Sequence, residues 1–167
     1  MKRSLLWGAI LVVVAGSLTG CSAPEHRITD DSLDVYGAKD IAQRMERALS
    51  AFVPKEATSS VEQIDSGVLL SCEGDRSFRW TGHLYMDLVT DIDTEPLVDE
   101  VAAHYSEEPG FWTERDTTRD GVPRVRVRGP HGSSYSMALS VDRTRIEILS
   151  FSPCFRLADG LHPRDTY

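Results

Sequence analysis

The sequence PRVRVRG places three arginines at alternating positions: Arg124, Arg126 and Arg128. Successive side chains of a β-strand point to opposite faces, so this spacing predicts an arginine stripe on one face and two buried valines on the other. Such a stripe could bind a carboxylate or phosphate of a partner or ligand. Ordinary cross-strand pairing with carboxylates such as Glu147 is the alternative, and the sequence leaves both interpretations open.

The other residues that could do chemistry lack the spacing that catalysis or metal binding requires. The five histidines are scattered, without an HxxxH or HxH pair. GPHGSSYS (129–136) puts serines beside a histidine but lacks the GxSxG of a nucleophile elbow, so a hairpin turn explains it better. The acids of DIDTEPLVDE (91–100) fit no EF-hand register and are better explained by helix capping. We therefore expect no catalytic residue, no metal site and no cofactor.

The first twenty residues have the pattern of an export signal. Lys2 and Arg3 precede the apolar run LLWGAILVVVAG, which is shorter than the about 20 residues that a membrane span requires. The segment ends in LTGC (18–21), which resembles the lipobox of bacterial lipoproteins. That resemblance implies that Cys21 receives a diacylglycerol thioether and becomes the mature N-terminus. A chance cysteine after an ordinary signal peptide is the alternative.

Cys72 and Cys154 then remain as a pair in a chain that is exported to an oxidising compartment. This predicts a single disulfide. The bridge would close a loop of about 80 residues, and the chain-entropy estimate for its stabilisation is at most about 4 to 5 kcal/mol. Two buried free thiols are the alternative. A zinc site is disfavoured, because no histidine or cysteine stands at the short spacing of metal sites.

Two segments have the apolar spacing of amphipathic helices. The first begins at Ala38 and ends before Pro54. Its apolar stripe is Ile41, Met45, Ala48, Leu49 and Phe52. The second runs through TEPLVDEVAAHY (94–105), where Asp93 or Thr94 can act as N-cap.

Alternating patterns predict the strands. FRWTGHLYMDLV (78–89) is the clearest, and its polar face carries His83 and Tyr85, which would extend the arginine surface if no helix covers that face. Gly82 on the apolar face indicates a bulge or a close approach by another element. A shorter strand with Val68, Leu70 and Cys72 on its core face is expected to pair with it as a hairpin. Further strands are expected in FWTERD, PRVRVRG, SYSMALSV and RTRIEILSFSPC.

The element order α-β-β-α-β-β-β-β predicts an α+β fold: an antiparallel sheet of about five to six strands with two helices packed on one face and one disulfide. A chain of 167 residues requires only one domain. We expect a signal peptide over 1–20, the lipidated cysteine and a flexible tether over 21–37, the domain over 38–160, and a C-terminal tail over 161–167.

Three features together resemble the small LppA-like lipoproteins of mycobacteria and related actinobacteria. They are the lipobox at Cys21, the LLSC strand with its hairpin, and the closing segment EILSFSPCFRLADGLHP. The resemblance implies an envelope location and a bridge between Cys72 and Cys154. It implies no catalytic residues, because none are established for that family.

The charge of the chain restricts its partners. The net charge is −8, and removal of Lys2 and Arg3 with the signal peptide leaves 16 basic residues against 26 acidic ones. Such a surface repels phosphates, so we expect no nucleic-acid partner. We expect a non-enzymatic binding module on the outer side of the cytoplasmic membrane, attached to it through the lipid on Cys21, with an unknown envelope protein or ligand as its partner. The alternatives are a carrier of a lipid or other apolar ligand, and an envelope hydrolase.

Overall fold

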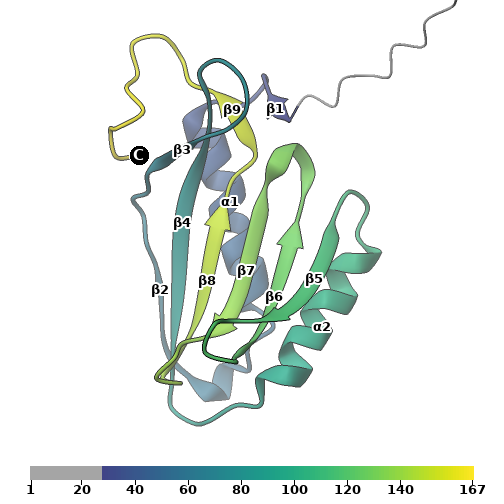
Figure 1. Cartoon of the computed structure of the whole chain (residues 1–167). Helices are drawn as coiled ribbons and strands as arrows, with labels where there is room; N and C mark the ends of the chain where they lie inside the picture. Colours follow the sequence, from purple (N-terminus) through teal and green to yellow (C-terminus); the bar gives the residue numbers. More distant parts are fainter. Residues whose placement is uncertain (1–27) are drawn as a thin grey trace, which may run out of the picture.

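The computed structural model describes residues 28–167, so the predicted signal peptide and the lipidation site Cys21 lie outside the described residues. The described chain contains two helices packed on one sheet (Figure 1). The helices are α1 (Val35–Ser50) and α2 (Thr94–Glu107). The strands are β1 (Thr29–Asp30), β2 (Thr58–Gln63), β3 (Leu69–Ser71), β4 (Ser77–Leu88), β5 (Trp112–Thr117), β6 (Pro123–Arg128), β7 (Ser134–Leu139), β8 (Arg145–Phe151) and β9 (Cys154–Arg156).

The strands form one curled sheet in the order β1-β9-β4-β8-β7-β6-β5, and β2 and β3 both pair with β4. The pairs are antiparallel except for β1 with β9, which is parallel. The expected α+β class and the two helices are therefore present. The expected purely antiparallel sheet of five to six strands is only partly right, because the sheet is mixed and has nine strands in the described chain.

The additional strands have sequences that carry no alternation. β1 and β9 contain two and three residues, which is too short for a period to show. β2 has the sequence TSSVEQ, in which the one apolar residue, Val61, is 56% exposed. Backbone pairing defines these three strands: β2 and β9 pair with the long strand β4, and β1 pairs with β9.

Both helices cover the same face of the sheet. α1 packs against β4 and β8, and α2 packs against β5 and β6. The larger core cluster joins the helices to alternate residues of the sheet, including Leu84, Val125, Met137 and Ile148. The residues between them belong to the opposite face, which neither helix covers.

α1 begins at Val35, three residues before the predicted start. Asp34 is its N-cap, and the Asp34 carboxylate accepts a hydrogen bond from the Gly37 N–H at 2.7 Å. Since β1 also precedes this helix, residues 29–37 include regular structure and do not all belong to a flexible tether. The predicted apolar stripe also differs from the buried face of α1. Leu49 is buried, but Ala48 is exposed, and Glu46 lies in the buried face.

The predicted core face of the short strand β3 is wrong. Leu69 is buried, whereas Val68 and Leu70 are 56% and 41% exposed. Leu69 lies directly opposite Trp80 of β4, and residues opposite one another in a sheet share a face. In a run of adjacent apolar residues the register with the neighbouring strand decides which residue is buried.

The disulfide between Cys72 and Cys154 is formed in the structure, with their Cα atoms 6.2 Å apart. Cys72 follows β3 and Cys154 begins β9, so the bridge joins the β3–β4 hairpin to the last strand. The predicted pairing of these two cysteines is present in the described chain.

Candidate functional site

The uncovered face of the sheet brings together side chains from five neighbouring strands. We call it the open face. Cross-strand registers arrange it in rows perpendicular to the strands. One row holds Trp112, Arg128, Ser134 and Phe151; the next holds Glu114, Arg126, Ser136, Leu149 and His83; the third holds Asp116, Arg124, Ala138, Glu147 and Tyr85. The three arginines therefore form the predicted stripe on β6, and Val125 and Val127 beneath them are fully buried.

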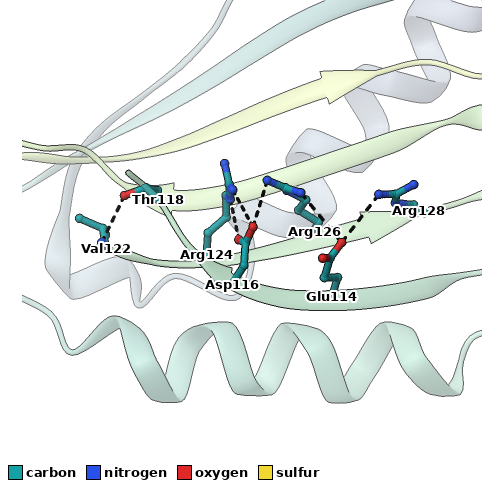
Figure 2. A network of polar contacts seen from close by, with 7 residues as sticks. All are labelled: Glu114, Asp116, Thr118, Val122, Arg124, Arg126 and Arg128. Carbon is teal, nitrogen blue, oxygen red and sulfur yellow. Dashed lines mark hydrogen bonds and ion pairs between the residues drawn. The ribbon is translucent and has the colours of Figure 1, made fainter. Parts of the chain in front are cut away.

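The arginine stripe is paired with carboxylates of β5 (Figure 2). Arg124 donates two hydrogen bonds to Asp116, at 2.8 and 2.7 Å, and Arg126 lies 3.0 Å from the same carboxylate. Hydrogen bonding from Arg124 holds the pKa of Asp116 below its usual value and raises the pKa of Arg124 itself. Cross-strand pairing is thus real, but the partner strand is β5.

Glu147 is not the partner of the stripe because of its position in the sheet. Ala138 of β7 lies between it and Arg124 in the same row, which separates them by two strand spacings. The residues that do pair, Glu114 and Asp116, belong to FWTERD, a segment predicted as a strand without an assigned neighbour.

The three arginines differ in how many of their N–H donors are already used in hydrogen bonds. Arg124 is bidentate with Asp116, whereas Arg128 makes no hydrogen bond with its side chain in the described residues and lies 3.7 Å from Glu114. Its guanidinium stacks over the exposed ring of Trp112, 5.0 Å from the ring centroid. Arg126 is 3.9 Å from Glu114. Arg128 and Arg126 therefore keep N–H donors that Arg124 has used.

A groove of about 510 Å³ lies on the open face beside the stripe. Its lining includes the arginines of β6 and a fourth arginine, Arg79 of β4. Between them lie two serines of β7, Ser134 and Ser136, and two apolar residues of β8, Leu149 and Phe151. No acidic residue lines the groove in the described chain. The sheet thus offers a cationic hollow on a protein that is acidic as a whole.

Arg79 is not among the residues that the sequence pattern predicts as a site. It stands alone in the strand FRWTGHLYMDLV, without the repeated arginines that mark β6. In the structure its guanidinium carbon lies 4.7 Å from the Phe151 ring centroid, and its Nε is buried without a hydrogen-bond partner among the described residues. Its position on the polar side of an alternating strand was the available signal.

His83 and Tyr85 lie on the open face, as expected if no helix covers it. Their rings are stacked with centroids 5.9 Å apart, and the Arg145 guanidinium lies over Tyr85 at 5.4 Å. They extend the surface beyond the groove, because neither residue lines it.

A polar cluster inside the core was also missed. Glu46 of α1 is fully buried and accepts hydrogen bonds from Ser150 at 2.5 Å and Gln63 at 2.7 Å. Burial raises the pKa of this carboxyl, and the hydrogen bonds partly offset that effect. A Cβ at Gly82 would lie 2.5 Å from the Glu46 carboxylate, so the predicted close approach at this glycine is confirmed.

The remaining chemical candidates have structural roles in the described chain. Residues 130–132 form the turn between β6 and β7, as predicted for GPHGSSYS. Asp93 caps α2 by accepting a hydrogen bond from the Glu95 N–H at 3.1 Å. Residues 28–167 contain no cluster of three or more histidine, cysteine, aspartate or glutamate side chains that could hold a metal ion.

No helix within residues 28–167 combines the length and the apolar composition that crossing a membrane requires.

Comparison with known proteins gives a similarity of fold. No protein-family model matches this chain, and no curated protein matches it. Among solved structures, the crystal structure of a DUF4853 family protein from Actinomyces odontolyticus, determined at 2.65 Å resolution, is similar with a TM-score of 0.51 and 12% sequence identity. The similarity covers 77% of this chain and 71% of that chain. The chain therefore shares its fold with a protein of an actinobacterium.

Proposed function

We propose that this protein is a lipid-anchored lipoprotein of the cell envelope and a non-enzymatic binding module whose open face holds its partner or ligand. The observation that carries the proposal is the uncovered sheet face with its arginine-lined groove. The order of basic residues, apolar run and lipobox supports the anchor. A fold shared with an actinobacterial protein is consistent with the resemblance to LppA-like lipoproteins.

The distance between the lipid anchor and the folded domain determines where the protein would meet its partners. Residues 22–28 separate Cys21 from β1, and a chain of that length spans at most about 25 Å when fully extended. A domain held this close to the membrane meets its partners at the membrane surface. Confinement raises the effective concentration there, so a modest affinity is sufficient for occupancy.

The anchor is tested by metabolic labelling of the full chain with a fatty-acid analogue. The wild type is expected to carry the label and Cys21→Ser to lose it. An unlabelled wild type would show that the chain is not a lipoprotein.

The binding surface is tested by a double variant, R126S/R128S, which is expressed in the native cells and purified from their envelope. Arg124 is left in place because its bidentate pair with Asp116 supports the sheet. The matched control R119S/R164S removes the same charge from two exposed arginines that do not line the groove. We expect R126S/R128S to lose co-purifying envelope components that the control retains. Equal recovery from both variants would count against the open face as the binding surface.

A second candidate, a carrier of an apolar ligand, has one observation in its favour. An open groove of about 440 Å³ lies between α1 and the turn at Pro130–Gly132, and its lining includes Leu33, Ile41, Met45 and Phe111. Binding of a fluorescent fatty acid to the full chain, abolished by M45E and retained by R128S, would support this function over the first. Absence of such binding would exclude it.

A further inference from the structure

We infer that the groove on the open face binds a small soluble organic oxyanion, a carboxylate or phosphate joined to an apolar group, and that Arg79 is its anchor. The inference rests on the proposed function of the open face and names the class of ligand. It is carried by the charge of the groove, the state of Arg79, and the apolar side chains beside it.

The groove carries a local excess of positive charge. Four arginines line it, and two carboxylates, Glu114 and Asp116, approach them from β5. Asp116 is committed to Arg124 and Arg126, while Glu114 stays beyond hydrogen-bond distance of its arginines. Glu147 also lies on this face but stands outside the lining. Two positive charges thus exceed the nearby acids in the groove, which is complementary to a monoanion or dianion.

Arg79 is positioned for such an anion and is occupied by nothing else in the described chain. Among residues 28–167 its side chain makes no hydrogen bond or ion pair, and its Nε is the one buried side-chain nitrogen or oxygen without a partner. Buried donors are nearly always satisfied, so an unpaired one marks a place where a further acceptor is stabilising. The Arg79 guanidinium lies over the Phe151 ring, and its planar fork matches a carboxylate or phosphate.

The neighbours of Arg79 provide both polar and apolar contacts. Ser134 lies opposite Phe151, and Ser136 lies opposite Leu149, so each hydroxyl stands beside an apolar side chain. Neither serine hydroxyl makes a hydrogen bond within residues 28–167, which leaves two donors available to an oxyanion. Leu149 and Phe151 are half-buried and offer a surface for an aliphatic or aromatic group.

The size of the groove favours a small molecule. Its volume of about 510 Å³ falls within the about 300 to 1,000 Å³ of small-molecule sites. The chain as a whole carries a net charge of −8, which disfavours an anionic bilayer or a nucleic acid, because both need a broad area of contact. A small anion needs only the groove itself.

The test uses the full isotopically labelled chain in non-ionic detergent and the Arg79 Nε–Hε resonance, assigned by its loss in R79Q. Phenyl phosphate, inorganic phosphate and benzyl alcohol are the probes. We expect phenyl phosphate to shift the resonance saturably, with an affinity at least ten-fold higher than that of inorganic phosphate. Benzyl alcohol is expected to leave it unmoved.

R79Q is expected to weaken phenyl phosphate binding at least ten-fold, followed through the Arg128 Nε–Hε resonance. R79K keeps the charge without the planar fork and is expected to fall between R79Q and the wild type. The matched control R119Q removes an exposed arginine outside the groove and is expected to bind like the wild type. Thermal melting of each variant establishes that it is folded.

The absence of a saturable shift in the folded wild type would overturn the inference, as would equal affinities in R79Q and R119Q. Tighter binding of a polyglutamate peptide than of phenyl phosphate would overturn it too, since the ligand would then be an acidic polypeptide. In that case the open face would still be a binding surface. The open face fails as a binding surface only if the wild type binds neither phenyl phosphate nor the peptide and R126S/R128S also retains every envelope component that the wild type retains.

Discussion

Glu46 is a buried carboxyl that needs hydrogen-bond partners inside the core. A carboxyl among buried side chains loses hydration, and Ser150 and Gln63 restore only part of that loss with their hydrogen bonds. The arrangement requires Gly82, because a side chain there would overlap the carboxylate. The apolar spacing of α1 does not identify this position, because Glu46 lies in the buried face beside Leu49 and outside the predicted apolar stripe.

The raised pKa of Glu46 predicts a pH dependence of stability. Between its ordinary value of 4.5 and the raised folded value, the native state binds more protons than the unfolded state. Stability from this group is therefore fully present below 4.5 and falls as the pH rises through the folded pKa. We expect E46Q, which does not ionise, to gain stability relative to the wild type on going from pH 4 to pH 7. Urea unfolding of both proteins across this range measures the difference.

E46A supplies the control for packing. Removing the side chain leaves the Ser150 hydroxyl unpaired and takes one hydrogen bond from Gln63 beside a cavity, so a loss of about 2 to 4 kcal/mol is expected at pH 4. The loss should become smaller towards pH 7, because E46A also lacks the carboxyl that ionises in the wild type. Parallel pH profiles of E46Q and the wild type would contradict the pKa account.

At the scale of elements, the pairing of β5 with β6 depends on a shared set of charges. Arg124 and Asp116 form a half-buried bidentate pair, and Asp116 also meets Arg126. Glu114, one row along, stands 3.7 and 3.9 Å from its arginines. The same edge hairpin therefore contains one close pair and one loose pair.

We expect D116N to lower the unfolding free energy by about 1 kcal/mol and E114Q to change it by less than half as much, since loose surface pairs contribute little. The Asp116 pKa is depressed, so its contribution is present above 3.8 and is lost as the pH falls through the folded value. Chemical unfolding at pH 7 and pH 3 tests both statements. Equal effects of the two substitutions would contradict the distinction between the pairs.

The sequence predicts the helices and strands that have a clear apolar period. It does not predict features that depend on which strands are neighbours in the sheet. Alternation identifies β4, β6 and β7, and helical spacing identifies both helices. Alternation also predicts the arginine stripe, but it cannot say that β5 supplies its acids, since sheet neighbours follow from topology. For the same reason the predicted buried face of β3 is wrong. Arg79 becomes a candidate site residue only once the fold places Phe151 of β8 beside it.

At the scale of the whole molecule, contacts join segments that are far apart in the sequence. β1 pairs with β9, and the disulfide ties Cys154 to Cys72 across 82 positions of sequence. The last residue takes part as well: the Tyr167 carbonyl accepts hydrogen bonds from the Gly67 N–H at 2.8 Å and the Trp80 indole at 3.0 Å. The segment predicted as a C-terminal tail thus packs on β4.

The bridge is expected to stabilise the fold chiefly by restricting the unfolded chain. The chain-entropy estimate for a loop of this length is at most about 4 to 5 kcal/mol. We expect the C72A/C154A variant to unfold at lower urea concentration than the oxidised wild type, and to match the reduced wild type closely. A thiol reagent added to the denatured, unreduced chain should modify neither cysteine. Modification of both would contradict the bridge.

The central claim is that the open face, with its arginine-lined groove, is the surface through which the protein acts in the envelope. The most direct measurement places a photo-crosslinking amino acid in the full chain in living cells, at Ser136 within the groove or at Ala103 on the exposed side of α2. The account predicts crosslinked products from position 136 that weaken with R126S/R128S, and none of those products from position 103. The same products from both positions, or products from position 103 alone, would contradict it.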